Sequence, residues 1–153
     1  MLVNFIIMTD LTVYNDSTSK MIRYFLLMAI GVIIIVLFSL FQHVASSPGG
    51  EYYYSTFIGR NFKLPAKISF IITAFLVGYF WKLNPRHAGL SLFFIFPFTS
   101  LVEAIVYKGS HNLIPFEFVM FFVYALPSII AVYLGKFTFR QICQRNARKH
   151  STN

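Results

Sequence analysis

The sequence predicts an all-α membrane protein, with four transmembrane helices in an up-down antiparallel bundle and both termini in the cytoplasm. Of its 153 residues, 57% are hydrophobic and only 12% are charged, and the mean hydropathy is +0.66. Soluble domains usually contain about 25% charged and 45–50% apolar residues. The excess of apolar residues lies in four long runs, so the composition excludes a soluble enzyme, a disordered chain and a disulfide scaffold.

The first predicted helix spans residues 24–41, a run without any charged residue. A spanning helix takes ~20 residues, so this run is long enough to cross a bilayer. It is also longer than the ~7–15 apolar residues of a signal peptide, which favours an uncleaved helix. Residues 1–20 contain only a short apolar stretch. We interpret them as an interfacial segment, or as non-native if Met21 is the natural start.

The second predicted helix spans residues 64–81 and follows a longer connection over residues 42–63. Pro65 fits the first turn, where no backbone hydrogen bond is lost. Lys67 lies near the same end, from which its long side chain can reach the lipid headgroups. The connection contains the run Tyr52–Tyr54, and we expect it to lie at the membrane–water interface, where tyrosine is enriched.

The third and fourth predicted helices span residues 89–107 and 115–135. Each contains a proline, Pro97 and Pro127, and we expect both helices to kink there. Membrane bundles tolerate such kinks because neighbouring groups satisfy the freed carbonyls. The connections on either side of the third helix are short, which forces antiparallel neighbours.

The distribution of cations predicts the orientation. With four crossings, both termini and the middle connection share one side, and that side carries nine of the 13 Lys and Arg residues. The positive-inside rule places this side in the cytoplasm, in a plasma or inner membrane. Residues 21–140 then form the transmembrane domain, and residues 141–153 form a basic cytoplasmic tail.

A group of cations lies at the end of the fourth helix and in the tail: Lys136, Arg140, Arg145, Arg148 and Lys149. Two interpretations stay open. The cations act only as a topology anchor, which we favour, or they also bind anionic lipids or a partner protein. The expected partners are the lipid bilayer and, in addition, a second copy or another membrane protein. Nucleic acid is not expected, because the cations flank apolar runs.

Small residues spaced four apart occur in two of the predicted helices. Ala74 and Gly78 form one pair, and Ala131 and Gly135 form the other. Such pairs permit close approach of helices in a membrane. Because the pattern is frequent in chains of this composition, it gives only weak support for a dimer.

Four ionisable residues are predicted at the non-cytoplasmic face: His43, Glu103, His111 and Glu117. Glu117 lies in a first helical turn, where a carboxylate complements the helix dipole. Glu103 is harder to explain, because it lies inside an apolar run at the C-terminal end of a helix. The spacing matches no metal-binding motif, so we predict no metal and no cofactor.

Three functions remain compatible with these residues. The first is a structural, assembly or accessory role without catalysis, which we favour because most polar residues have simple explanations. The second is a small oligomeric transporter or channel, suggested by Glu103 within an apolar helix and by the two prolines. The third is a membrane enzyme that uses Glu103, His111 and Glu117 as acid, base or metal ligands.

Glu103 provides a test of these alternatives. An ionised carboxylate at lipid depth costs about 2.5–3.5 kcal/mol on insertion scales. We therefore expect it to point into the bundle, with a partner among Arg60, Tyr107, Lys108 and His111. Glu103→Gln keeps the shape but removes the charge. In a structural role the variant lowers the melting temperature modestly and leaves any activity intact, whereas in a catalytic or transport role it abolishes activity in a chain that still inserts and folds.

Overall fold

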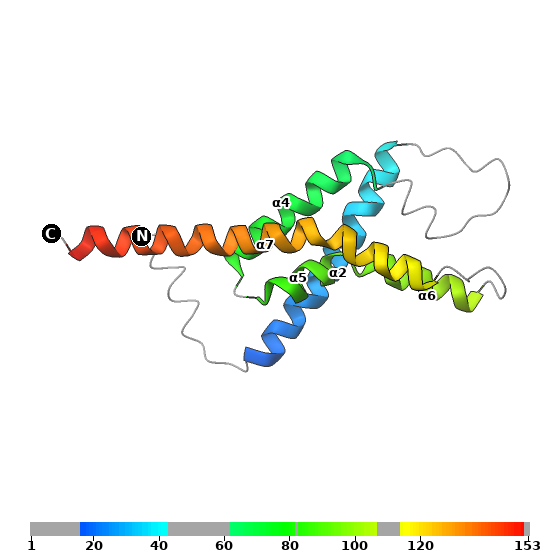
Figure 1. The fold of residues 1–153 in the computed structure, drawn as a ribbon, viewed down its shortest axis with the longest axis horizontal. Helices are drawn as coiled ribbons and strands as arrows, with labels where there is room; N and C mark the ends of the chain where they lie inside the picture. The colour runs from blue at the N-terminus through cyan, green and yellow to red at the C-terminus, as the bar shows by residue number, and fades with distance from the viewer. Residues whose placement is uncertain (1–15, 43–61, 82, 107–113, 152–153) are drawn as a thin grey trace.

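The computed structural model describes residues 16–42, 62–81, 83–106 and 114–151. Five helices form these ranges, in the order α2 (Asp16–Gln42), α4 (Leu64–Phe80), α5 (Pro85–Leu92), α6 (Ile95–Val106) and α7 (Ile114–Ser151) (Figure 1). No strand occurs among the described residues. The predicted all-helical class is therefore confirmed.

Two of the helices are long and apolar enough to cross a membrane. These spans are Thr18–Phe41 in α2 and Phe118–Ala147 in α7, whereas the apolar helix α4 has only 17 residues. Large apolar side chains of both spans point outward, as Leu40 (66% exposed) and Ile130 (56% exposed) illustrate. Water-soluble monomers rarely expose extended apolar surfaces, so these faces suit a membrane environment.

The third predicted helix is broken into α5 and α6, which meet at the turn residues Phe93 and Phe94. Pro97 supplies the physical reason. It has no N–H to donate to the carbonyl of Phe93, four residues earlier, and its ring would collide with that carbonyl in a regular helix. The N–H of Phe96 donates to the Phe93 carbonyl instead, at 3.1 Å, and this shorter-range bond ends the regular helix. The expected kink is thus a full break on the N-terminal side of the proline.

The fourth helix also differs from its predicted bounds. α7 has 38 residues and runs to Ser151, so the described part of the tail, from residue 141 onward, is a continuation of the helix. At ~1.5 Å per residue the helix is about 57 Å long, well beyond the ~30 Å of a bilayer core. Figure 1 shows α7 changing direction in the region that contains Pro127, between its orange and yellow parts.

At the first helix the difference is smaller. α2 begins at Asp16 rather than near residue 24, so residues 16–20 belong to the helix and not to a separate segment.

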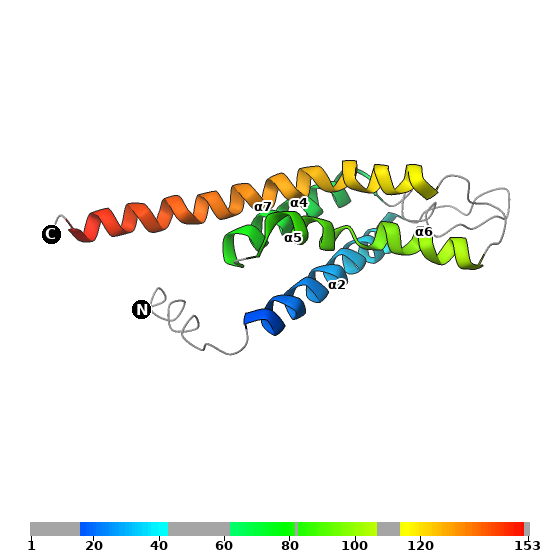
Figure 2. The ribbon, with the colours of Figure 1, turned by 60° about the horizontal axis from the view of Figure 1, so that its bottom comes forward.

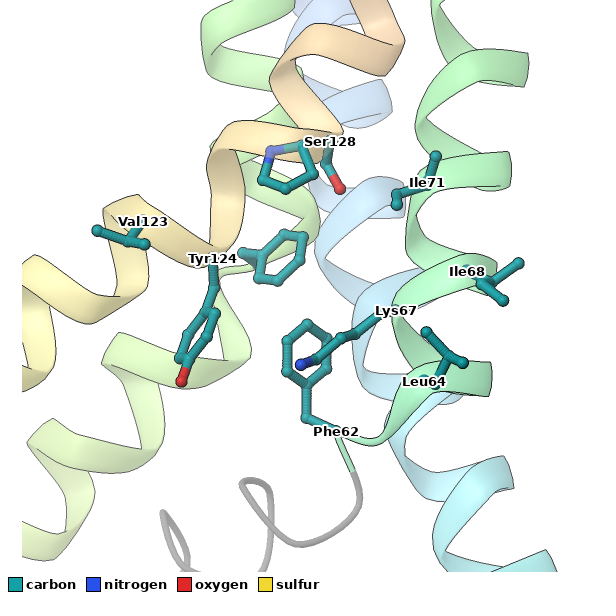
Figure 3. A pocket seen from close by; sticks show the side chains of 10 residues that line it. Phe62, Leu64, Lys67, Ile68, Ile71, Val123, Tyr124 and Ser128 are labelled. Carbon is teal, nitrogen blue, oxygen red and sulfur yellow. The ribbon is translucent and has the colours of Figure 1, made fainter.

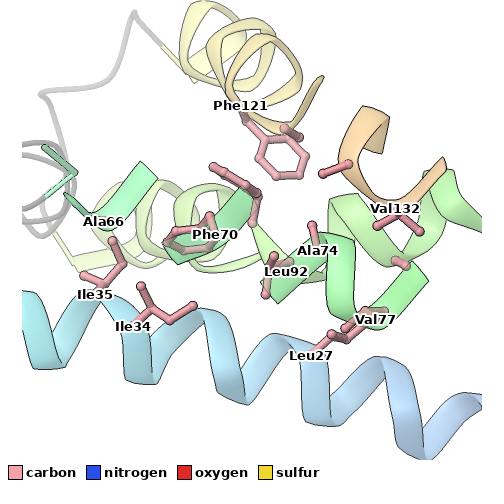
Figure 4. Close-up of a cluster of buried hydrophobic side chains, with 14 of the residues drawn as sticks. Leu27, Ile34, Ile35, Ala66, Phe70, Ala74, Val77, Leu92, Phe121 and Val132 are labelled. Carbon is pink, nitrogen blue, oxygen red and sulfur yellow. The ribbon is translucent and has the colours of Figure 1, made fainter. Parts of the chain in front are cut away.

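The chain direction alternates through the bundle. Leu27 of α2 lies near Val77 of α4, and Ile35 lies near Ala66, so the two helices are antiparallel (Figure 4). α4 and α5 lie between α2 on one side and α7 on the other (Figure 2). At the start of α5, the N–H of Asn84 donates to the Tyr24 hydroxyl oxygen at 3.3 Å, which ties this end to α2.

α4 and α7 make the most extensive helix–helix contact and run in the same direction. A Cβ atom on Gly78 would overlap the carbonyl of Val132, and one on Gly135 would overlap the carbonyl of Phe75. The two backbones therefore touch at glycine. Ala74 and Ala131 are buried at the same contact. The close approach expected from the small-residue pairs is confirmed, but it joins two helices of one chain and gives no support for a dimer.

We predict that Gly78→Ala and Gly135→Ala each destabilise the bundle. In an exposed helix the change from Gly to Ala stabilises by about 1 kcal/mol. Here the added methyl meets the backbone of the other helix, so the sign reverses and overpacking costs about 1–3 kcal/mol. Unfolding of the full chain in detergent measures the effect. Leu76→Ala, on the outward face of α4, is the control and should change stability less; a glycine variant as stable as the natural chain would contradict the contact.

Candidate functional site: two grooves along the α4–α7 contact

The predicted outer-face cluster cannot be located from the described side chains. Glu103 lies in α6 and Glu117 in the first turn of α7, but their side chains are outside the described part. His43 and His111 lie wholly outside the described residues. Convergence of these four residues stays a prediction. Among the described residues, no group of three or more His, Cys, Asp or Glu side chains could hold a metal ion.

The basic residues of the tail lie on helix α7. Lys136 is half-buried, and Arg140 and Arg145 are exposed, whereas the side chains of Arg148 and Lys149 are outside the described part. Lys136 and Arg140 are four residues apart and therefore share one face of the helix.

That face borders a pocket of about 320 Å³, which we call the basic groove. Its lining combines the end of α4 with α7, namely Gly78, Tyr79, Phe80, Trp81, Lys136, Phe139 and Arg140. The rings of Tyr79 and Phe139 meet edge to face, with centroids 5.6 Å apart, and form part of its wall. Two cations beside aromatic rings suit an anion at a membrane–water interface, where Trp and Tyr are enriched.

A second pocket, of about 380 Å³, lies at the other end of the same helix pair, and we call it the aromatic groove (Figure 3). It is lined by the loop before α4, the first half of α4, the α5–α6 turn and the middle of α7, namely Phe62, Leu64, Lys67, Ile68, Ile71, Phe93, Val123, Tyr124, Pro127 and Ser128.

Phe62 is the centre of the aromatic packing beside this groove. Its ring meets those of Phe70 and Tyr124 edge to face at 5.6 Å, and that of Phe96 at 5.1 Å. Phe70 is fully buried and packs on Phe93 with ring centroids 4.5 Å apart. Such pairs contribute ~0.5–1.5 kcal/mol each beyond the area they bury, so this wall of the groove is rigid.

Among the described residues, Lys67 is the only cation that lines the aromatic groove. Its Nζ atom lies 5.4 Å from the ring centroid of Phe62 and 5.9 Å from that of Tyr124. These distances are typical of cation–π contacts. The sequence predicted a lysine that extends to the headgroups, whereas the structure directs its ammonium over the two rings at the mouth of the groove (Figure 3).

Ser128 is the polar group on the far side of the groove from Lys67. Its side chain is 1% exposed, and its Oγ atom has no hydrogen-bond partner among the described residues. Other helical hydroxyls bond back to their own helix: Ser69 to the carbonyl of Pro65 at 3.1 Å, and Ser100 to that of Phe96 at 3.2 Å. A buried hydroxyl without a partner carries a desolvation cost of about 1–3 kcal/mol, so Ser128 is a candidate ligand contact.

Comparison of the chain with models of known protein families, with curated proteins and with solved structures finds no match. The site therefore rests on the geometry alone. Sequence reasoning missed Ser128 and Trp81. The only sequence signal for Ser128 is its position directly after a proline inside a predicted helix. The only signal for Trp81 is its position at the end of an apolar run.

Proposed function

We propose that the protein is a small integral membrane protein that crosses the bilayer four times and has a structural, assembly or accessory role without catalysis. In this proposal the four crossings are α2, α4, the broken pair α5–α6, and α7. The alternating chain direction and the excess of cations on one side support this arrangement. Both termini then face the cytoplasm of a plasma or inner membrane, and partner proteins bind the exposed apolar faces.

The basic groove is the observation that carries the proposal. It joins the end of α4 to the middle of α7, so an anionic lipid bound there would stabilise the largest helix contact of the bundle. The only acidic residue of α7 is Glu117, more than five helical turns before Lys136, so no carboxylate of the helix lies near Lys136 and Arg140. An anionic headgroup supplies the missing charge, and each cation near such a surface contributes about 1 kcal/mol.

A transporter is the second candidate, because broken helices often form transport sites. The break between α5 and α6 argues for the structural role instead. Phe93 is 2% exposed at this break and packs on Phe70, and the N–H groups of Phe93 and Phe94 are bonded to carbonyls of α5. The broken segment is thus closed by ring packing and its own hydrogen bonds, and both residues of its turn are phenylalanines, which offer no side-chain ligand for an ion.

Trp81 is the only tryptophan of the chain and lines the basic groove, so its fluorescence reports on lipid bound there. We predict that brominated phosphatidylglycerol quenches Trp81 at lower mole fraction than brominated phosphatidylcholine. Arg140→Gln should reduce this preference about fivefold, the ratio that corresponds to ~1 kcal/mol for one lost cation. Lys136→Gln should act in the same direction.

Arg145→Gln is the matched control, because it removes the same charge from α7 at an exposed position outside the groove lining. It should leave the preference nearly unchanged. Equal quenching by the two lipids in the natural chain, or equal effects of Arg140→Gln and Arg145→Gln, would contradict a specific lipid site and leave only a diffuse topology anchor.

A further inference from the structure

We propose that the aromatic groove is a second lipid site, which takes one glycerophospholipid of net negative charge. The lipid phosphate contacts the ammonium of Lys67, an ester carbonyl accepts a hydrogen bond from the hydroxyl of Ser128, and an acyl chain follows the apolar wall. The inference does not depend on the basic groove, which lies at the opposite end of α4.

The unpaired hydroxyl of Ser128 is the first support. In a regular helix the Ser128 hydroxyl could bond the carbonyl of Tyr124, in the way that Thr138 bonds that of Leu134 at 2.9 Å. Its Oγ atom instead has no partner and belongs to the groove lining, and Figure 3 shows it directed away from α7 toward the side of Ile71. A ligand that accepts its hydrogen bond would remove the cost of burying it.

Pro127, next to Ser128 in the groove wall, interrupts the hydrogen bonding of α7. It has no N–H to donate to the carbonyl of Val123, which lines the groove with it. Figure 1 shows that α7 changes direction in the region that contains Pro127. Ser128 therefore directly follows the position where the regular hydrogen bonding of α7 is interrupted.

The charge of Lys67 selects an anionic ligand. The sequence contains no acidic residue between Tyr52 and Val102, so no carboxylate of α4, α5 or the first part of α6 can pair with it. The rings of Phe62 and Tyr124 lie beneath the ammonium, which is exposed at the mouth of the groove. A phosphate placed there gains a charge-assisted hydrogen bond, which is stronger than a neutral one.

The order of groups along the groove matches a phospholipid. Lys67 lies about one helical turn, or about 6 Å, before Ile71 along α4. Ser128 of α7 lies on the side of the groove where Ile71 is (Figure 3). The side walls, with Leu64 (69% exposed), Ile68 (46%) and Val123 (49%), open outward to the region that lipid chains occupy. A volume of about 380 Å³ falls within the ~300–1,000 Å³ of small-molecule sites and exceeds what a free phosphate needs.

The experiment uses the full chain in detergent micelles, with Lys136→Gln and Arg140→Gln already introduced so that the basic groove does not contribute. Binding of phosphatidylglycerol, phosphatidylcholine, oleate and inorganic phosphate is measured by native mass spectrometry and by the shift in melting temperature. We expect phosphatidylglycerol to bind most tightly. Ser128→Ala and Lys67→Gln should each weaken its binding about tenfold, the ratio expected for one lost hydrogen bond to a charged or buried group.

Matched controls separate binding from folding. Ser69→Ala removes a hydroxyl of α4 that bonds its own helix, and Lys63→Gln removes a neighbouring cation outside the groove lining; neither should weaken lipid binding. Lys67→Arg keeps the charge and should keep the preference for phosphatidylglycerol. Without lipid, Ser128→Ala should melt at the same or a higher temperature, because it removes an unpaired buried group.

Four results would overturn the proposal. The first is a lower melting temperature of lipid-free Ser128→Ala, which would mean that the hydroxyl bonds within the protein. The second is unchanged lipid binding in Ser128→Ala or Lys67→Gln, and the third is equal binding of phosphatidylcholine and phosphatidylglycerol. The fourth is an equal shift in melting temperature with inorganic phosphate or oleate, which would identify a free anion or a fatty acid as the ligand.

Discussion

The close backbone contact between α4 and α7 is the constraint on which the rest of the structure depends. Packing at small residues lets apolar helices approach closely, and between helices in a bilayer it takes the place of the hydrophobic effect. Gly78 and Gly135 let the two backbones touch, and Ala74 and Ala131 continue the same surface. The two helices run in parallel, and one groove lies toward the start of α4 and the other at its end. The contact that stabilises the bundle therefore also creates both candidate sites.

Much of the fold could be predicted from the sequence, because long apolar runs have few alternatives in a membrane. The runs that became α2, α4 and α7 were identified, and so was the close approach at Gly78 and Gly135. The break of the third helix was not predicted. The effect of Pro97 was expected at the proline itself, whereas the carbonyl that loses its donor belongs to Phe93, four residues earlier. The partner of the small-residue pairs could not be inferred either, because spacing within a helix does not identify the surface it meets.

The candidate sites could likewise be predicted only in part from the sequence. Lys136 and Arg140 were identified as candidate lipid ligands from charge alone, but only the continuation of α7 as a helix places them on one face beside Trp81. Lys67 was recognised as an interfacial cation, but its position over Phe62 depends on a loop residue that packs into the core. Ser128 could not be singled out, since most helical serines bond their own backbone and only the three-dimensional structure reveals one that does not.

The most direct test of the α4–α7 contact is cross-linking within the chain. Tyr79 and Phe139 place their rings 5.6 Å apart, so Tyr79→Cys and Phe139→Cys, in a chain with Cys143→Ser, should react with a short bifunctional thiol reagent to give a cross-linked monomer. Leu76→Cys with Phe139→Cys is the control, because Leu76 faces outward. The account predicts efficient monomer cross-linking for the first pair only. Cross-linked dimers without cross-linked monomer, or equal reaction of both pairs, would contradict the contact.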